Sequence, residues 1–158
     1  MARRYGRCAK GERLRASIPY GHWKTTTFLA GLCHDRLIAP LALDGPIDGD
    51  SFRAYVEQFL APALLPGQIV VLDNLSSHKV AGVREAIEAV GAHILYLPRY
   101  SPDLNPIEQL FSKLKALLRK AAARTVDALW LAVGQIIQNL PAQECRNYFA
   151  NAGYRHST

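Results

Sequence analysis

The stretch IVVLDNLSSHK, which runs from Ile69 to Lys79, decides the fold class. Its opening residues are continuously apolar, and Pro66-Gly67 and Asp73-Asn74 bound them on either side. A short apolar run between turn residues is typical of a central strand that is buried on both faces. We therefore expect residues 69–72 to form an inner strand of a sheet.

The flanking sequence predicts two helices and a further strand. Apolar residues recur at helical spacing over 52–64, with Asp50 or Ser51 as the expected N-cap, and a second helix is expected over about 79–90. The run HILYL, residues 93–97, predicts the next strand. A strand, a helix and a strand in this order predict parallel neighbours joined by a helical crossover.

An antiparallel hairpin is expected ahead of these elements. Residues 24–32 (KTTTFLAGL) and 37–43 (LIAPLAL) are rich in Thr and apolar side chains, and His34-Asp35 separates them. Pro40 has no backbone N–H to donate, so it pushes the second strand towards an edge or a bulge. Together these elements predict an α/β fold in which helices flank a mixed sheet.

Two amphipathic helices are expected after the last strand. The first begins near Asn105-Pro106, and its apolar arc consists of Ile107, Leu110, Phe111, Leu114, Leu117 and Leu118. Thr125 is the expected N-cap of a last helix, which Pro141 ends. Both helices are most simply elements that cover a core.

Asp73 is the first candidate site residue. It follows the apolar strand directly, and ligands of open α/β sheets gather at this edge. The alternative is purely structural. Asp73-Asn74 would start a turn through side-chain bonds to the backbone, and Ser76 or Ser77 would cap the next helix.

Glu108 is the second candidate, and it also has a structural alternative. Asn105 suits an N-cap and Pro106 the first helical position, which puts Glu108 at the third position of a capping box. On a helical wheel, however, Glu108 lies beside the apolar arc, so it can lean over the sheet edge towards Asp73. Neighbouring carboxylates stay ionised only with a cation between them, and magnesium prefers oxygen ligands. We therefore expect a two-metal site for phosphodiester chemistry, with Mg²⁺ or Mn²⁺ bound by Asp73 and Glu108.

The sequence around both carboxylates resembles the catalytic core of DDE transposases. The strings VVLDNLSSHK, LPRYSPDLNPIEQLFSKLK, RRYGRCAKGERL and YGHWKTTTFLAGL are similar to the bacterial insertion-sequence branch of the mariner superfamily. In this chain 34 residues separate Asp73 from Glu108, and the resemblance covers about residues 3–150. It implies a ribonuclease-H-like fold and metal-dependent cut-and-paste chemistry, with transposon ends and target DNA as partners.

The resemblance also implies roles for individual residues. Asp73 matches the second catalytic Asp, and Glu108 matches the closing Glu. Asn74 and His78 belong to the first motif, although a His near a helix start is more often a cap or a hydrogen-bonded core residue. Asn105 and Pro106 would shape the turn that aims Glu108.

One part of the family pattern has no counterpart in this sequence. The first catalytic Asp of the family lies on a central strand upstream of the segment RRYG, and its helix-turn-helix domains are absent here. Residues 1–158 are therefore expected to be a single, partial catalytic core that lacks the central strand. An upstream transposase segment or a homo-oligomer would complete it, and the isolated chain is expected to be inactive.

The charge distribution favours a polyanionic partner. The net charge is +6 and the isoelectric point is near 9.4, and Glu12 is the sole acid among the first fifteen residues. The alternative for the later basic residues is an ordinary solvated helix face. The candidate DNA contacts are Arg3, Arg4, Arg7, Lys113, Lys115, Arg119 and Lys120.

The cysteines and the absence of long apolar segments indicate the compartment. The chain has three cysteines, an odd number, without a C-x-x-C pair, which argues against a disulfide framework or a zinc site. Neither a signal peptide nor an apolar stretch of about 20 residues is present. We expect no membrane contact and a bacterial cytoplasmic location, nucleoid-associated when the protein is bound to DNA.

Two other functions remain open at the level of sequence. The missing Asp favours a non-catalytic fragment that binds DNA or dimerises with an intact transposase. A hydrolytic nuclease on the same fold would cleave phosphodiesters without joining DNA ends. A strand-transfer assay separates the transposase from the nuclease.

Overall fold

A computed structural model of the protein describes residues 7–13, 15, 25–121 and 125–154. Residue contacts divide the chain into two compact units. One consists of Lys24–Gln109 and Pro141–Thr158, and the other of Met1–Trp23 and Leu110–Leu140. Both candidate carboxylates belong to the first of these units.

The predicted hairpin is present. Strands β1 (Thr26–Leu32) and β2 (Leu37–Asp44) pair antiparallel, and the register shifts between Leu29 and Gly31. Opposite this shift lies Ala39, which adopts a positive φ of 49° directly before Pro40. The bulge expected at Pro40 is therefore confirmed.

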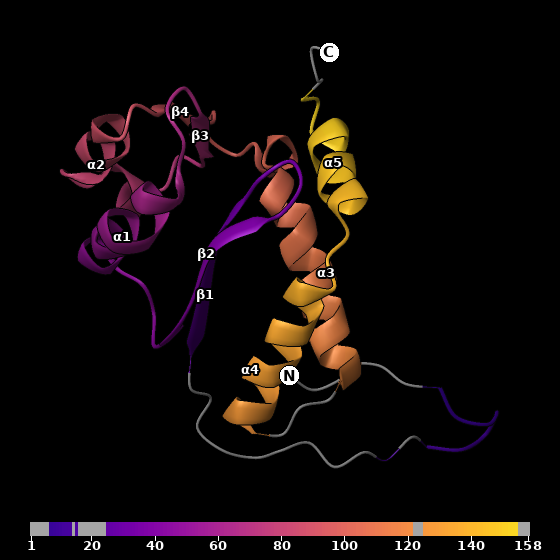
Figure 1. The fold of residues 1–158 in the computed structure, drawn as a ribbon. Helices are drawn as coiled ribbons and strands as arrows, with labels where there is room; N and C mark the ends of the chain where they lie inside the picture. Colours follow the sequence, from indigo (N-terminus) through magenta and orange to yellow (C-terminus); the bar gives the residue numbers. More distant parts are fainter. Residues whose placement is uncertain (1–6, 14, 16–24, 122–124, 155–158) are drawn as a thin grey trace. The chain divides into compact units, whose positions relative to one another are not determined.

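The predicted parallel pair is also present. Strands β3 (Ile69–Leu72) and β4 (His93–Tyr96) pair in parallel, and helix α2 (Val83–Ala89) lies in the connection between them. The described residues form two separate two-stranded sheets, because no strand among them pairs with both β1 and β3 (Figure 1). Together the antiparallel hairpin and the parallel pair give the mixed strand directions that the sequence predicts.

Strand β3 is less buried than its apolar sequence predicts. The side chain of Ile69 is 64% exposed, and Val70, Val71 and Leu72 are only half-buried. The expectation of burial on both faces was wrong, because only one face of β3 packs against the core. Its alternate residues Val70 and Leu72 pack against the core, which leaves the other face open.

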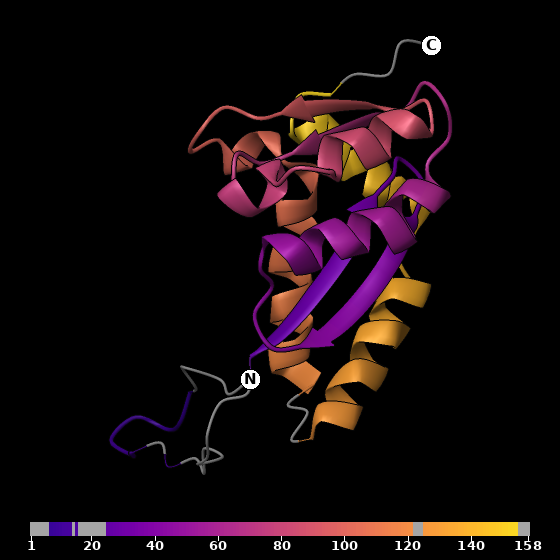
Figure 2. The same cartoon turned by 90° about the vertical axis from the view of Figure 1, so that its left-hand side faces the viewer.

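The core of this unit is built by α1 (Gly49–Tyr55), a π-helix (Val56–Leu60), a 3-10 turn (Ala61–Ala63) and α2. These helical turns lie against the hairpin (Figure 2), and Leu29, Ile38 and Leu41 of the hairpin pack on their apolar face. The buried residues of the cluster are Phe52, Tyr55, Val56, Leu60, Val83, Ile87 and Ala92. Apolar burial of this kind is the main stabilising term of a small domain.

The N-cap of α1 differs from the sequence expectation. Asp48, rather than Asp50 or Ser51, caps the helix, and its Oδ1 accepts a hydrogen bond of 2.8 Å from the backbone N–H of Ser51. All three residues are acceptable caps by type, so only the backbone conformation distinguishes them. Asp48 is extended, with φ −108°, while Asp50 already lies inside the helix.

This cap predicts a loss of stability in acid. The hydrogen bonds from Ser51 hold the pKa of Asp48 below its usual value of 3.8. Stability from such a carboxylate is full above the unfolded pKa and disappears as the pH falls through the lower folded pKa. Asn caps a helix at every pH. Between about pH 5 and pH 2 the wild type should therefore lose more free energy of unfolding than Asp48→Asn.

Urea unfolding at several pH values measures the difference. Asp50→Asn is the matched control, because Asp50 does not cap the helix, and it should follow the wild-type curve. Equal acid losses in the wild type and Asp48→Asn would contradict the assignment of the cap.

The remaining helices are α3 (Pro106–Ala121), α4 (Val126–Gln138) and α5 (Ala142–Asn151). The predicted arc of α3 is confirmed, because Leu110, Leu114 and Leu118 are buried. Thr125 caps α4 as predicted and accepts a bond of 3.2 Å from the N–H of Ala128. No helix in the described ranges has the length and apolar character that crossing a membrane requires.

Helix α5 was missed, because α4 was expected to be the last helix. Pro141 ends α4 but also serves as the N-cap of α5. The apolar stripe of α5 is short, and its buried members are Cys145, Tyr148 and the following Ala152. Polar residues between them weaken the periodic signal, although the spacing of three and four residues is the helical one.

Candidate metal centre

Asp73 lies where β3 ends and the chain turns towards a 3-10 helix at Ser76–Lys79. Its Oδ1 accepts a hydrogen bond of 3.3 Å from the N–H of Leu75 and lies 2.6 Å from Nδ1 of His78. The turn expected from the structural alternative is therefore real. Both contacts fall on Oδ1, and Oδ2 has no hydrogen bond or ion pair with a described residue. The side chain is 37% exposed, so a ligand from solvent can reach Asp73.

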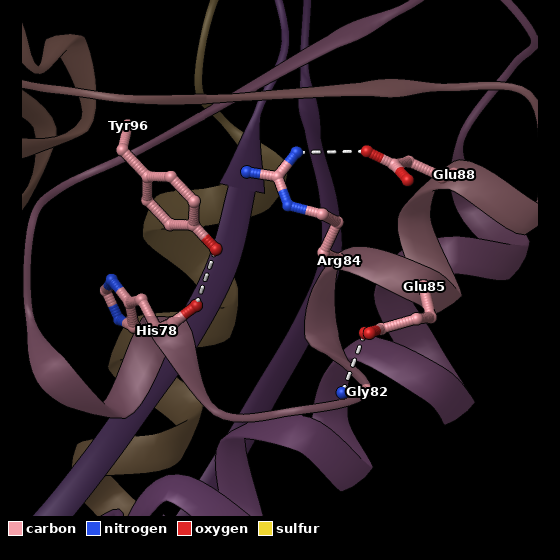
Figure 3. Close-up of polar contacts among 6 residues, drawn as sticks. All are labelled: His78, Gly82, Arg84, Glu85, Glu88 and Tyr96. Atoms are coloured by element: carbon pink, nitrogen blue, oxygen red, sulfur yellow. Dashed lines mark hydrogen bonds and ion pairs between the residues drawn. The ribbon is translucent and has the colours of Figure 1, made fainter.

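The other half of the structural alternative was wrong. Neither Ser76 nor Ser77 caps α2, because both lie inside the 3-10 helix that precedes it. The N-cap is Gly82, whose N–H donates to Oε2 of Glu85 at 2.8 Å (Figure 3). Gly82 has a positive φ of 96°, a conformation that glycine adopts more readily than residues with a side chain.

The imidazole of His78 is seated between the core and the candidate site. Its ring centroid lies 4.2 Å from that of Phe52, and its backbone carbonyl accepts a bond of 3.0 Å from the hydroxyl of Tyr96 (Figure 3). Only 18% of the side chain is exposed. His78 therefore packs against the core, as expected for a lone His, and also contacts Asp73 directly.

Asn74 contributes a buried polar atom without a partner. Its Oδ1 is shielded from solvent and makes no hydrogen bond with the described residues. A buried acceptor without a donor costs about 1–3 kcal/mol. An uncompensated oxygen directly after Asp73 is compatible with a cation or its bound water as the missing partner.

Glu108 lies in the first turn of α3 and is half-buried. In a capping box its carboxylate would bond to the N–H of Asn105, but that N–H donates to the carbonyl of Pro102 at 3.0 Å. Among the described residues the carboxylate of Glu108 has no hydrogen bond or ion pair. The capping-box alternative for Glu108 is therefore not realised, and its oxygens remain free to bind a ligand.

The turn ahead of Glu108 is well anchored. Asn105 is buried, with 8% of its surface exposed, and its carbonyl accepts a bond of 3.1 Å from the N–H of Glu108. Pro106, the first residue of α3, is buried as well. Both placements agree with the expected role of these residues in shaping the turn.

Helix α5 and Tyr154, which follows it, bond to this segment. The hydroxyl of Tyr154 donates to the carbonyl of Leu104 at 2.9 Å, and the amide of Asn151 donates to Oε1 of Gln109 at 3.3 Å. The amide of Gln109 in turn donates to the carbonyl of Tyr148 at 3.4 Å. These bonds fall on both sides of Glu108. Burial raises the pKa of Tyr154, which keeps its hydroxyl a donor.

The donor set suits a hard divalent cation. Carboxylate and amide oxygens are the ligands that Mg²⁺ and Mn²⁺ prefer, and Asp73, Asn74 and Glu108 supply oxygen alone. The described part of the chain contains no cluster of three His, Cys, Asp or Glu side chains that could hold a metal. These oxygen ligands therefore suit a divalent ion, but they include two carboxylates, whereas the family pattern implies three.

The candidate DNA contacts lie in the other compact unit. On α3 the side chains of Lys113, Lys115, Arg119 and Lys120 are all exposed. Arg7 is exposed too, whereas Arg3 and Arg4 lie outside the described residues. Their exposure suits contact with phosphates, but it equally suits a solvated helix face.

Comparison with known proteins gives a family and a fold. The family model described as DDE superfamily endonuclease matches residues 1–130. No curated protein matches the chain. Among solved structures, the Mos1 strand transfer complex is similar with a TM-score of 0.78 at 17% identity, over 95% of this chain and 46% of that chain. The catalytic domain of Mos1 mariner transposase has a TM-score of 0.69 at 15% identity, over 82% of this chain and 74% of that chain.

These similarities confirm the expected fold class. The separate two-stranded sheets and their helices match the ribonuclease-H-like fold of the transposase catalytic domain. The chain spans about half the length of the protein in the strand transfer complex.

Proposed function

The chain belongs to the DDE superfamily of endonucleases, and from that premise we propose that it is the catalytic region of a DNA transposase of the bacterial insertion-sequence branch. One observation carries the proposal. Asp73 at the end of β3 keeps Oδ2, and Glu108 at the start of α3 keeps both carboxylate oxygens, without a hydrogen bond or ion pair among the described residues.

Asp73 and Glu108 are the proposed metal ligands and catalytic residues. Bound Mg²⁺ or Mn²⁺, in a two-metal site, would activate the attacking oxygen and stabilise the leaving oxygen of a phosphodiester. Two similar structures support the choice of metal: a Mos1 mariner paired-end complex with Mn and the Mos1 catalytic domain with Mg. Asn74 and His78 would support Asp73, and Asn105 and Pro106 would aim Glu108.

The third carboxylate would come from outside the described residues. The described ranges contain no group of three His, Cys, Asp or Glu side chains that could hold a metal ion. The unpaired edges of β1 and β3 offer backbone groups to a further strand. We propose that an upstream transposase segment, or another copy of the protein, supplies both the strand and the carboxylate. The isolated chain would then be inactive.

DNA is the proposed partner. Similar structures are described as a strand transfer complex and as a paired-end complex with the left transposon end. The exposed basic residues of α3 supply charge for phosphates. Transposon ends and target DNA are therefore the proposed substrates, and the proposed location is cytoplasmic, on the nucleoid when bound.

A cleavage assay tests the proposal. The purified chain is incubated with Mg²⁺ and DNA that carries the ends of its own element, with and without a co-expressed upstream segment. We expect nicking and strand transfer only with that segment. Cleavage without joining would instead identify a hydrolytic nuclease. Specific nicking by the chain alone, lost in Asp73→Ala, would contradict the missing third ligand.

The second candidate is a non-catalytic fragment that binds DNA or dimerises with an intact enzyme. The absence of a three-residue metal cluster among the described residues favours it. It predicts DNA binding without cleavage under every condition of the same assay.

A further inference from the structure

We propose that His78 is the positioning residue of this metal centre. It fixes Oδ1 of Asp73 and thereby keeps Oδ2 turned towards the divalent cation. The inference rests on the proposed function of Asp73 as a metal ligand, and it assigns to His78 a task that no sequence motif specifies. His78 itself does not touch the reacting atoms.

The contact between the side chains of His78 and Asp73 is short. Nδ1 of His78 lies 2.6 Å from Oδ1 of Asp73 and is shielded from solvent. This nitrogen makes no aligned hydrogen bond with the described residues, so its close contact with the carboxylate oxygen is the polar contact that the structure gives it. The N–H of Leu75 approaches the same oxygen at 3.3 Å. Two groups thus engage Oδ1, while Oδ2 engages none of the described side chains.

His78 is itself held at its ring and at its backbone. Phe52, which is only 4% exposed, supports the ring at a centroid distance of 4.2 Å. The backbone of His78 is tied to β4 by the hydroxyl of Tyr96, at 3.0 Å (Figure 3). Because Tyr96 pairs with Leu72, the residue before Asp73, the carboxylate and the imidazole are anchored to the same strand pair. The ring therefore has a fixed position relative to the carboxylate.

Fixing the carboxylate matters because Asp73 is otherwise loosely held. Its side chain is 37% exposed, and apart from His78 a single long bond from a backbone N–H restrains it. Groups that orient a metal ligand from outside the coordination sphere typically contribute about 10–100-fold to metal affinity. A free Asp73 would have to give up rotational freedom each time the metal binds.

A purely structural role for His78 predicts something different. If the ring only fills space beside Phe52, any residue that loses the stacking should behave alike. Asn and Gln separate the two roles. The amide nitrogen of Asn is attached to Cγ, as Nδ1 is, whereas that of Gln reaches the place of Nε2. Both lose the ring on Phe52 to the same extent.

The test measures Mn²⁺ affinity of the full 158-residue chain by calorimetry or by electron paramagnetic resonance. The variants are His78→Asn, His78→Gln and Asp73→Asn, and thermal unfolding without metal records their stability. We expect His78→Gln to lose about 10-fold or more in Mn²⁺ affinity. His78→Asn should stay within about threefold of the wild type, with both His78 variants equally stable without metal.

The outcomes separate this inference from the proposed function. If Asp73→Asn weakens Mn²⁺ binding but His78→Gln does not, His78 has no positioning role and the metal site stands. Equal losses in His78→Asn and His78→Gln would reduce His78 to a packing residue. If the wild type does not bind Mn²⁺, or Asp73→Asn binds it equally well, the proposed metal site fails and the role of His78 fails with it.

Discussion

Asp73→Asn and Glu108→Gln should each weaken Mn²⁺ binding by more than about 100-fold and abolish Mg²⁺-dependent cleavage by the completed transposase. Each change removes the charge of a direct metal ligand, so the loss should exceed the 10–100-fold typical of outer-shell changes. Both substitutions conserve shape. Calorimetry with Mn²⁺ measures the first effect, and cleavage of transposon-end DNA measures the second.

Matched carboxylates outside the site provide the controls. Asp44, at the end of β2, and Asp103, in the turn before α3, are both exposed. Asp44→Asn and Asp103→Asn remove the same unit of charge and should leave Mn²⁺ affinity unchanged. Equal losses in the controls would mean that net charge, rather than coordination, governs binding.

DNA affinity should fall by about 10³ between 50 and 200 mM salt if the basic residues of α3 and the N-terminal segment make about six phosphate contacts. Each neutralised phosphate releases counterions, so the slope of log K against log salt reports the number of contacts. Replacement of Lys113, Lys115, Arg119 and Lys120 with Gln should lower that slope by about four. Fluorescence anisotropy with a short duplex measures it.

Two basic residues of the other compact unit serve as the control. Arg36 pairs with Asp35 at 2.8 Å, and Arg84 pairs with Glu88 at 3.0 Å (Figure 3). Replacement of both with Gln should change the salt slope by much less than the α3 set. A weak salt dependence of the wild type, or no binding at low salt, would leave α3 with an ordinary solvated face.

The elements that depend on local sequence patterns could be predicted from the sequence alone. The bulged hairpin, the parallel pair β3–β4, the apolar arc of α3 and the Thr125 cap were all predicted. Each depends on periodicity or on turn residues within a few positions, and such patterns are readable from one strand or helix alone. The motif text around Asp73 and Glu108 likewise indicated the family.

Tertiary structure decided how the side chains are used. Asp48, Asp50 and Ser51 are equivalent caps by type, and the backbone entering α1 selects Asp48. By its sequence position Glu108 fits a capping box, but in the structure the N–H of Asn105 donates to the carbonyl of Pro102 instead. His78 contacts Asp73 because Tyr96 of β4 and the Phe52 ring hold it in place. Tyr154, which follows α5, bonds to the turn before Glu108. Many of these contacts join residues far apart in sequence, and one polar group can bind several partners. Only the packed chain selects among them.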